Sequence, residues 1–465
     1  MTEKIPDQVQ KQIDKMTEAF RNGLTGLYCW SNGVDMSHGP TAIEIEERIC
    51  KWIQQIGQDT QSLILAGMDR NRRKSKQRCP TCEEEVYWKR YEPRNYITSL
   101  GEMRLERAYY HHGICRCGWV PLDERLELGA SELSPRVQEM GSYLGAWMPF
   151  EQARIFLSKY CGIQISHDTV NNTTVAIGQA LKEKQEAEVS HVWEESCLPA
   201  CEVDPPPKRL YVSADGIKHL LPSGQGKEIK VAAVYETEER HNKKGETEIH
   251  AIDIEYVVHT NAEELARAAY LLAVKRGVET AEEIIILGDG ANWIWNRIAG
   301  MFLKRKRTDI LDFFHVTGYI WDAAKAVYGK ETTETNAWSE KQCHILKHAG
   351  PSTVLWALRT LTPADCMIPE PVAKAITYFE NQCPRMDYPA YTQRGLQIGS
   401  GSAESAVNLI VGYRMNQTGM RWNAERAEAV AHARAAILSD RWDDFWSDFS
   451  PTPRRYERKD LPLVV

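Results

Sequence analysis

The feature that most constrains the fold is a fixed succession of strand and helix patterns between residues 208 and 314. Five short segments either alternate apolar and polar side chains or are apolar throughout, and turns containing glycine separate several of them. These segments, which we expect to be strands, cover residues 208–215, 229–235, 249–258, 284–287 and 310–314. A helical pattern over about 261–276 lies between the third and the fourth. The fourth is continuously apolar, as a buried central strand should be.

Three meandering strands, a helix and a strand–helix–strand unit form the order of the ribonuclease-H-like fold, in which the first and fourth strands lie side by side. Asp215 ends the first strand, and Asp289 follows the fourth within Gly288-Asp289-Gly290. An aspartate at a single strand end usually forms a turn. Two aspartates at these particular ends would lie together, so the pattern predicts a pair of functional carboxylates.

A third carboxylate would complete a site for two divalent cations. The best candidate is Glu404, within a helical pattern at 399–407 that Ser400 or Ser402 would cap. Two Mg²⁺ or Mn²⁺ ions about 3.5–4 Å apart can activate the attacking oxygen and stabilise the leaving oxygen of a phosphodiester. The alternative for Glu404 is a favourable interaction with the helix dipole alone. The preceding region, about 316–398, is expected to be a helical insertion.

Four cysteines in two close pairs predict a structural zinc site. Cys79 and Cys82 form a C-x-x-C pair, and Cys115 and Cys117 form a C-x-C pair, with strand patterns between them. Tetrahedral zinc takes four such ligands, and a hairpin between two pairs is typical of a zinc ribbon. His111 and His112, which come shortly before the second pair, are possible substitute ligands. The alternatives are unpaired buried cysteines and, less plausibly, redox chemistry.

Helical patterns dominate the rest of the N-terminal half. Residues 6–60 read as helices, in which Ala42, Ile43, Ile45, Ile49, Trp52, Ile53 and Ile56 are expected to form one apolar stripe. Residues 131–190 also read as helical, with a break at Gly162 and a helix start at Ser166. This shape favours a helix-turn-helix that contacts DNA, although an ordinary helical hairpin is nearly as good an interpretation.

Basic side chains suggest where phosphates would bind, although the net charge of the chain is -7. The expected DNA-binding residues are Arg70, Arg72, Arg73, Lys74, Arg414, Arg421 and Trp422. Arg426 and the run at 304–307 have the same character. The two basic runs could equally be solvated loops, and arginines on an amphipathic helix, as at 414–426, are more often solvent-exposed.

These observations predict a multidomain α/β protein. The expected parts are a helical region (1–78), a zinc-ribbon-like module (79–120), a helix-turn-helix-like segment (121–204), a ribonuclease-H-like catalytic domain (205–450) and a tail (451–465).

Several motifs resemble those of the ISKra-type DDE transposases of bacterial insertion sequences. The motifs are Cys79-x-x-Cys82, Arg107-Ala-Tyr-Tyr110, Pro121-Leu-Asp-Glu124, Asp215-Gly216, Gly288-Asp-Gly290, Asp312-Phe-Phe-His315, Gly401-Ser-Ala-Glu404, Arg414-Met415 and Gly419-Met-Arg-Trp422. They follow the family's order over about residues 79–446. The resemblance implies a DDE triad of Asp215, Asp289 and Glu404 that binds two Mg²⁺. It also implies that His315 lies near the scissile phosphate, whereas a lone histidine could equally be a hydrogen-bonding core residue.

The expected function is that of a transposase, which cleaves the ends of its element and joins them to target DNA. The partners would be double-stranded DNA, in the form of terminal inverted repeats and target, and further copies of the chain, because two ends must be brought together. One alternative is a nuclease or resolvase of the same fold that does not join strands. Another is a non-catalytic DNA-binding regulator. A glycosidase with a carboxylate pair is a weaker third.

The sequence predicts neither export nor a membrane partner. The N-terminus has no apolar signal region, and no stretch approaches the roughly 18 apolar residues of a membrane span. Twelve cysteines in so long a chain do not suggest a disulfide framework. The expected location is the bacterial cytoplasm, in association with the nucleoid.

Overall fold

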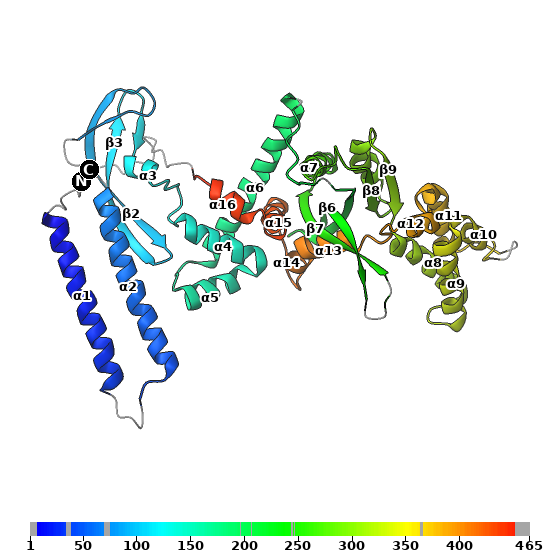
Figure 1. Ribbon diagram of the computed structural model, residues 1–465, viewed down its shortest axis with the longest axis horizontal. Helices are drawn as coiled ribbons and strands as arrows, with labels where there is room; N and C mark the ends of the chain where they lie inside the picture. The colour runs from blue at the N-terminus through cyan, green and yellow to red at the C-terminus, as the bar shows by residue number, and fades with distance from the viewer. Residues whose placement is uncertain are drawn as a thin grey trace. The chain divides into compact units, whose positions relative to one another are not determined.

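The computed structural model describes residues 7–33, 39–68, 75–195, 197–205, 207–242, 245, 247–362 and 366–451 (Figure 1). The protein has several domains and mixes helices with two β-sheets. Its contacts divide it into two compact units, Met1–Thr173 with Asp444–Val465, and Thr174–Asp443. The division falls within one long helix, α6 (His167–Glu195). We describe each unit separately.

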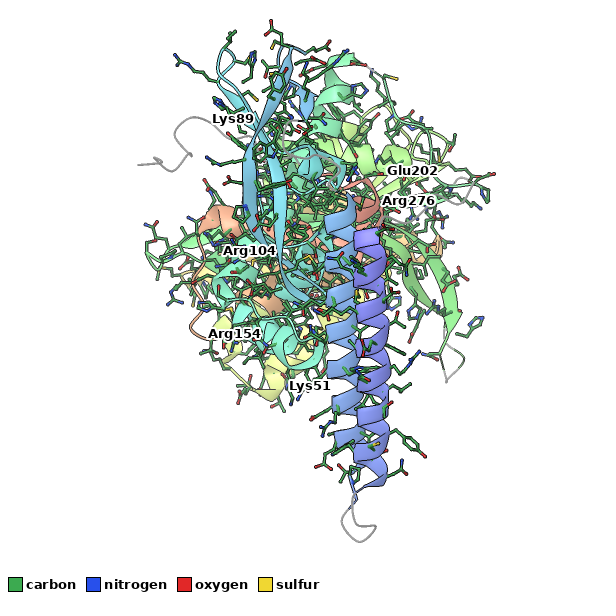
Figure 2. The ribbon with its side chains drawn as sticks, turned by 90° about the vertical axis from the view of Figure 1, so that its left-hand side faces the viewer. Lys51, Lys89, Arg104, Arg154, Glu202 and Arg276 are labelled. Atoms are coloured by element: carbon green, nitrogen blue, oxygen red, sulfur yellow. The ribbon has the colours of Figure 1, made fainter. Side chains whose placement is uncertain are left out.

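The first unit begins with a helical hairpin of α1 (Asp7–Asn32) and α2 (Ala42–Met68), which lie side by side (Figures 1 and 2). The expected apolar stripe on α2 is only partly covered. Ile45, Trp52 and Ile56 are half-buried, whereas Ile43, Ile49 and Ile53 are exposed. Among the described helices, α1 is the one that packs along α2, and part of the apolar surface of α2 faces solvent.

A four-stranded antiparallel sheet follows the hairpin, in the order β1-β2-β3-β4. Its strands are β1 (Lys76–Arg78), β2 (Glu85–Thr98), β3 (Gly101–His112) and β4 (Cys117–Trp119). We expected Pro93 to separate two strands, but β2 continues through it. Because β1 pairs only with residues 85–87 of β2, the edge beside Pro93 has no ladder partner among the described strands, and a missing N–H is tolerated there.

Helices complete the first unit: α3 (Pro121–Arg125), α4 (Pro135–Trp147), α5 (Phe150–Cys161) and the start of α6. The expected break at Gly162 and the helix start at Ser166 are confirmed. Gly162 ends α5 in the left-handed region, with φ 68°. The Ser166 hydroxyl accepts a hydrogen bond of 3.0 Å from the Thr169 N–H at the start of α6. Leu157, Ile163 and Val170 are fully buried at this corner.

The second unit is built on a five-stranded sheet with the order β7-β6-β5-β8-β9. The strands are β5 (Arg209–Leu220), β6 (Gly226–His241), β7 (Thr247–His259), β8 (Glu283–Gly288) and β9 (Arg307–Leu311). The first three pair antiparallel, whereas β5–β8 and β8–β9 are parallel. The expectation that the first and fourth strands lie side by side is confirmed. Every residue of β8 is buried, which explains its unbroken apolar pattern.

Helices cover this sheet and extend from it. The helix α7 (Ala262–Lys275) begins at the Asn261 cap and precedes β8, as expected. After β8 the chain forms a π-helical turn η1 (Ile294–Ile298) and a 3₁₀ turn η2 (Ala299–Phe302). The region expected to be a helical insertion contains α8 (Phe313–Tyr328), α9 (Thr333–Ala349), α10 (Pro351–Arg359), α11 (Glu370–Gln382), η3 (Cys383–Arg385) and α12 (Tyr388–Gln393). The last helices are α13 (Gly401–Val407), η4 (Asn408–Gly412), α14 (Tyr413–Met415), α15 (Ala424–Leu438) and α16 (Trp442–Asp448).

Candidate active site and metal centre

Asp215 and Asp289 lie next to each other at one edge of the five-stranded sheet. The parallel ladder between β5 and β8 ends at the pair Ala214 and Gly288, and each aspartate is the next residue along the chain. We had expected Asp215 to end its strand. The strand β5 instead continues to Leu220 through pairing with β6. The two carboxylates nevertheless follow the same last rung of the ladder.

Backbone groups hold one oxygen of each aspartate. The Gly216 N–H donates to Asp215 Oδ1 at 2.6 Å, and the Ala291 N–H donates to Asp289 Oδ1 at 2.8 Å. The Oδ2 atoms have no hydrogen-bond partner among the residues that the structure describes. Each carboxylate is therefore oriented by the chain and keeps an oxygen for another ligand.

The electrostatics of Asp215 show that four predicted site residues share one environment. The pKa of Asp215 is raised to about 6, with burial as the largest cause and the charges of Asp289 and Glu404 acting in the same direction. The Gly216 hydrogen bond and the charge of His315 act in the opposite direction. A half-buried carboxyl that feels the charges of two others is an environment that a divalent cation would stabilise in its ionised form.

Glu404 reaches this environment from α13, which packs against β5 and β6. Its side chain is exposed. The three carboxylates do not converge as tightly as a preformed ligand cage: among the described residues, no three carboxylate groups lie within 4.8 Å of one another. Mutual repulsion of like charges keeps such groups apart unless a cation lies between them.

The expectation that Ser400 or Ser402 caps α13 is wrong. Ser400 occupies the cap position, but its hydroxyl and its backbone N–H both donate to Asp312 Oδ2. Asp312 Oδ1 accepts from the His315 N–H, and so caps α8. Because α8 begins here, the last strand ends at Leu311 and not at Phe314 as predicted.

Asp312 is thus a site residue that the sequence analysis placed in a motif but to which it gave no role of its own. It is 5% exposed and connects the start of α8, which carries His315, with the start of α13, which carries Glu404. Its own N–H donates to the Gly288 carbonyl at 2.8 Å, one residue before Asp289. The only signal in the sequence was the Asp312-x-x-His315 spacing, which is that of a helix N-cap and its third residue.

Two stacked tyrosines lie beside His315 and the Asp289 loop. The rings of Tyr319 on α8 and Tyr378 on α11 are 4.0 Å apart and 14° from parallel. The His315 ring centroid is 5.7 Å from Tyr319 and 6.0 Å from Tyr378. A Cβ at Gly290 would lie 2.5 Å from the Tyr378 ring, so only glycine allows this approach. The charge of Asp289 contributes to raised pKa values of both tyrosines, although burial is the larger cause.

A groove of about 470 Å³ opens next to these rings, between the Asp289 loop and the helices α8 and α11. Its lining combines aromatic, amide and charged side chains, among them Asn292, Tyr319, Lys374, Tyr378 and Asn381. A polar groove with aromatic walls is suited to a nucleic-acid strand, whose bases stack and whose phosphates attract cations.

A separate centre in the first unit brings together Cys79, Cys82, His112 and Cys115. Their ligand atoms all lie within 4.8 Å of one another. His112 Nδ1 is 3.3 Å from the sulfur of Cys82 and 3.3 Å from that of Cys115. The ligands of tetrahedral zinc, with Zn–S of about 2.3 Å, are about 3.5–4 Å apart. The set of donors and its compactness therefore fit a structural zinc ion.

The prediction that Cys117 is the fourth ligand is wrong, because His112 takes that place. Cys117 begins β4 opposite His112 and packs against the apolar cluster that contains Tyr110 and Trp119. Arg116, with φ 50°, turns the chain between Cys115 and Cys117. Only the first cysteine of the C-x-C pair therefore belongs to the cluster.

The thiols of this centre influence one another strongly. Burial raises the pKa of Cys79, but hydrogen bonds from the Thr81 and Cys82 N–H groups and from His112 outweigh it and bring the pKa to about 6. Interaction with Cys82, followed by burial and Cys79, raises the pKa of Cys115 to about 12. The Cys79 thiol therefore ionises more easily than an ordinary thiol, whereas the Cys115 thiol ionises less easily. A bound cation would stabilise both as thiolates.

The predicted DNA-binding residues differ in how far the structure exposes them. Arg414 is 1% exposed and stacks on Trp422, itself 7% exposed, with the guanidinium 4.9 Å from the ring centroid. Burial lowers the pKa of Arg414 to about 10. The prediction that these two contact DNA is wrong, because they stabilise the interior of the unit. Arg421 is exposed. Arg70, Arg72, Arg73 and Lys74 lie outside the described residues, as does the expected tail beyond Pro451.

The sequence profile described as "Uncharacterised protein family (UPF0236)" matches residues 36–441. This match spans most of the chain, so the protein belongs to the UPF0236 family. Within the described residues, no helix is both long enough and apolar enough to cross a membrane.

Three curated relatives carry the same family name. A UPF0236 protein of Caldanaerobacter subterraneus subsp. tengcongensis, whose name joins eleven locus designations, is 24% identical over 295 residues, 62% of this chain and 56% of that protein. A second from the same organism, whose name joins four locus designations, is 22% identical over 408 residues, 86% of this chain and 78% of that protein. A "UPF0236 protein in vanSb 3'region" of Streptococcus gallolyticus is 28% identical over 162 residues, 34% of this chain and 32% of that protein. The chain thus matches little more than half the length of the first relative.

Proposed function

We propose that the protein is a DNA transposase of the DDE class, which cleaves the ends of an insertion sequence and joins them to target DNA. The observation that carries this proposal is the placement of Asp215 and Asp289 directly beyond the last rung of the parallel β5–β8 ladder, with Glu404 in the same electrostatic environment. The strand order β7-β6-β5-β8-β9 supports a ribonuclease-H-like core.

Asp215, Asp289 and Glu404 would hold two Mg²⁺ or Mn²⁺ ions. Such ions supply an activated attacking oxygen and charge stabilisation for the leaving oxygen of a phosphodiester. The chain's own contribution is positional: the Gly216 and Ala291 N–H groups orient the aspartates, and Asp312 fixes the starts of the helices that carry His315 and Glu404. His315 is exposed at the start of α8, where it would face the scissile phosphate.

The remaining parts would recognise DNA. We propose that Cys79, Cys82, His112 and Cys115 bind zinc and stabilise a ribbon-like module, and that this module and the α5–α6 corner bind the terminal repeats of the element. Two ends must be held together for joining, so the active form would be a homodimer or higher oligomer on DNA, associated with the nucleoid of a bacterial cell.

The names of the relatives add independent support. One name joins eleven locus designations and another joins four. A protein shared by several loci of one genome is what a gene that copies itself within that genome would produce, and a nuclease or regulator of the host gives no such expectation.

The test uses the full chain and labelled duplexes that carry the DNA flanking its gene, with Mg²⁺ or with EDTA. We expect cleaved and strand-joined products with Mg²⁺ alone. Asp289→Asn should abolish both products while end binding, measured by fluorescence anisotropy, remains. Asp253→Asn is the matched control, because it makes the same change at an exposed position of β7 in the same sheet.

Other outcomes separate the alternatives. Cleavage without joining would replace the proposal by a nuclease or resolvase. Tight end binding without chemistry in the presence of Mg²⁺ would favour a DNA-binding regulator. Loss of binding in Asp289→Asn would mean that the carboxylate is structural.

A further inference from the structure

The α1–α2 hairpin has an apolar face that nothing in its own unit covers. None of its described side chains is fully buried. The exposed apolar residues of this face are Phe20 (46% exposed), Leu24 (52%), Tyr28 (69%), Ile49 (38%) and Ile53 (57%). Isolated exposed apolar residues are ordinary, but a contiguous set marks an interaction surface.

Helix geometry places these side chains on the same face. Gly23 and Trp52 face each other across the hairpin, because a Cβ at Gly23 would lie 2.2 Å from Trp52 Nε1. Leu24 follows Gly23 and Ile53 follows Trp52, and each side chain is turned by about 100° about its own helix axis relative to the residue before it. Because the helices are antiparallel, equal turns bring both side chains to the same side of the hairpin. Phe20 and Tyr28 lie four residues from Leu24, and Ile49 lies four from Ile53, so they extend the same two stripes.

The other sides of α2 are already used or are polar. Its C-terminal half packs on the sheet of the first unit, where a Cβ at Gly57 would lie 3.2 Å from Leu100. Gln61 accepts a 2.9 Å hydrogen bond from the Thr98 hydroxyl. The N-terminal half of α2, together with α1, extends beyond the sheet (Figure 2). The α5–α6 corner also approaches α2, because a Cβ at Gly162 would lie 2.5 Å from Nε2 of Gln54, the residue after Ile53. The side chains of the apolar face remain 38–69% exposed beside these contacts.

We propose that this face docks against the same face of a second copy of the chain, so that two hairpins form an antiparallel four-helix bundle. A self-complementary apolar patch is what a two-fold dimer requires, and four-helix packing is the stable way to bury a pair of two-helix hairpins.

Charge argues for a second copy over nucleic acid. The helix α1 carries three basic and three acidic residues. The helix α2 carries two basic and four acidic residues, so the hairpin has a net charge of -2. A surface that binds phosphates is positive. Such a hairpin has no electrostatic attraction for DNA or for an anionic membrane.

The exposed area is sufficient. At about 200 Å² for a fully exposed side chain of this size, the five exposed fractions amount to roughly 500 Å² per copy. Two copies would bury roughly 1,000 Å² through apolar side chains alone, which already reaches the lower limit for a specific interface before polar neighbours are added.

The test needs no DNA, so it is independent of the proposed function. Sedimentation velocity of the purified full chain over 0.5–50 μM should show a dimer. Leu24→Glu and Ile53→Glu should each weaken self-association by roughly a hundredfold or more, because each would bury a charge without a partner. Thr25→Glu and Lys51→Glu, exposed neighbours that point to other faces, should leave it unchanged; Lys51 is labelled in Figure 2.

Circular dichroism checks that the variants keep their helix content. A wild-type chain that is monomeric throughout this concentration range would overturn the proposal, as would dimers that persist in both Glu variants. Flotation of the chain with vesicles of phosphatidylcholine and phosphatidylglycerol, lost in Leu24→Glu, would overturn it in favour of a lipid surface.

Discussion

The carboxylate of Asp312 accepts hydrogen bonds from both the backbone N–H and the hydroxyl of Ser400. Asp312 therefore fixes the start of α13 relative to the start of α8, which it also caps through the His315 N–H. Asp312 and Ser400 can act as positioning residues without contacting a substrate. The pair determines where Glu404, four residues after Ser400, stands relative to the two aspartates.

Asp312→Asn should separate this positioning effect from chemistry. The asparagine side chain has an NH₂ group in place of one of the two accepting oxygens. This NH₂ group would then face an N–H donor, of His315 or of Ser400, and could not accept its hydrogen bond. We expect the free energy of unfolding to fall by about 1–3 kcal/mol, the cost of an unsatisfied buried hydrogen bond. Cleavage of labelled DNA ends should slow, with end binding unchanged. Urea unfolding and cleavage rates measure the two effects.

Ser400→Ala is the graded comparison, because it removes only the hydroxyl bond and keeps the N–H bond. It should cost about 1 kcal/mol and slow cleavage less. Equal effects of the two substitutions would contradict a role for the shared carboxylate.

The metal centre predicts a clear difference between neighbouring cysteines. Cys82→Ser and His112→Ala should each reduce bound zinc from one equivalent to a small fraction, because three ligands hold zinc much less tightly than four. Cys117→Ser should keep one equivalent, since Cys117 lies outside the cluster. Metal analysis of the purified chains, before and after dialysis against a chelator, gives the answer. Loss of zinc in Cys117→Ser with retention in His112→Ala would restore the ligand set that spacing alone suggests.

The contact between Gly290 and Tyr378 predicts a coupled pair of substitutions. Gly290→Ala places a Cβ 2.5 Å from the Tyr378 ring, so it should destabilise the second unit by about 1–3 kcal/mol through overpacking. Adding Tyr378→Ala removes the clash, and the double variant should be more stable than the sum of the single losses implies. Chemical denaturation of the four chains measures the coupling. Strict additivity would show that the loop moves away from the ring.

Much of the fold could be predicted from the sequence because its signals are local. The buried strand β8 is apolar at 284–287, the two aspartates follow strand patterns, and Gly162 and Ser166 carry the turn and cap chemistry of a helical corner. Strand order then followed from the succession of elements, since β5 and β8 can pair in parallel only across an intervening crossover.

The errors came from properties that depend on tertiary neighbours. Spacing cannot tell whether Cys117 or His112 reaches a metal, because a turn at Arg116 decides it. A basic residue in a helical pattern resembles a phosphate ligand, yet Arg414 is buried against Trp422. The apolar pattern of α2 likewise does not reveal which of its side chains α1 and the sheet leave exposed. In each case the missing information is what occupies the space next to the residue.

A buried ion cluster between α6, β7 and α15 predicts sensitivity to acid. Glu428 accepts hydrogen bonds from the Thr260 N–H at 2.7 Å and from Lys182 Nζ at 2.8 Å. Burial raises the pKa of Glu428, but these bonds and the charge of His259 outweigh it and bring the pKa to about 2. A carboxylate whose pKa is lowered by folding adds stability above its unfolded pKa of about 4.3, and the stability is lost as the pH falls through that value toward 2.

Glu428→Gln should therefore destabilise the second unit most near neutral pH, by about 2–4 kcal/mol, because Lys182 keeps a buried charge without its main partner. The difference from the wild type should shrink as the pH falls from 4.5 toward 2. Glu425→Gln, on the exposed side of the same helix, is the control and should change stability by less than about 0.5 kcal/mol. Urea unfolding at pH 7, 5 and 3 measures these differences. A Glu428→Gln deficit that is the same at pH 7 and pH 3 would mean that packing, and not charge, makes Glu428 important to the fold.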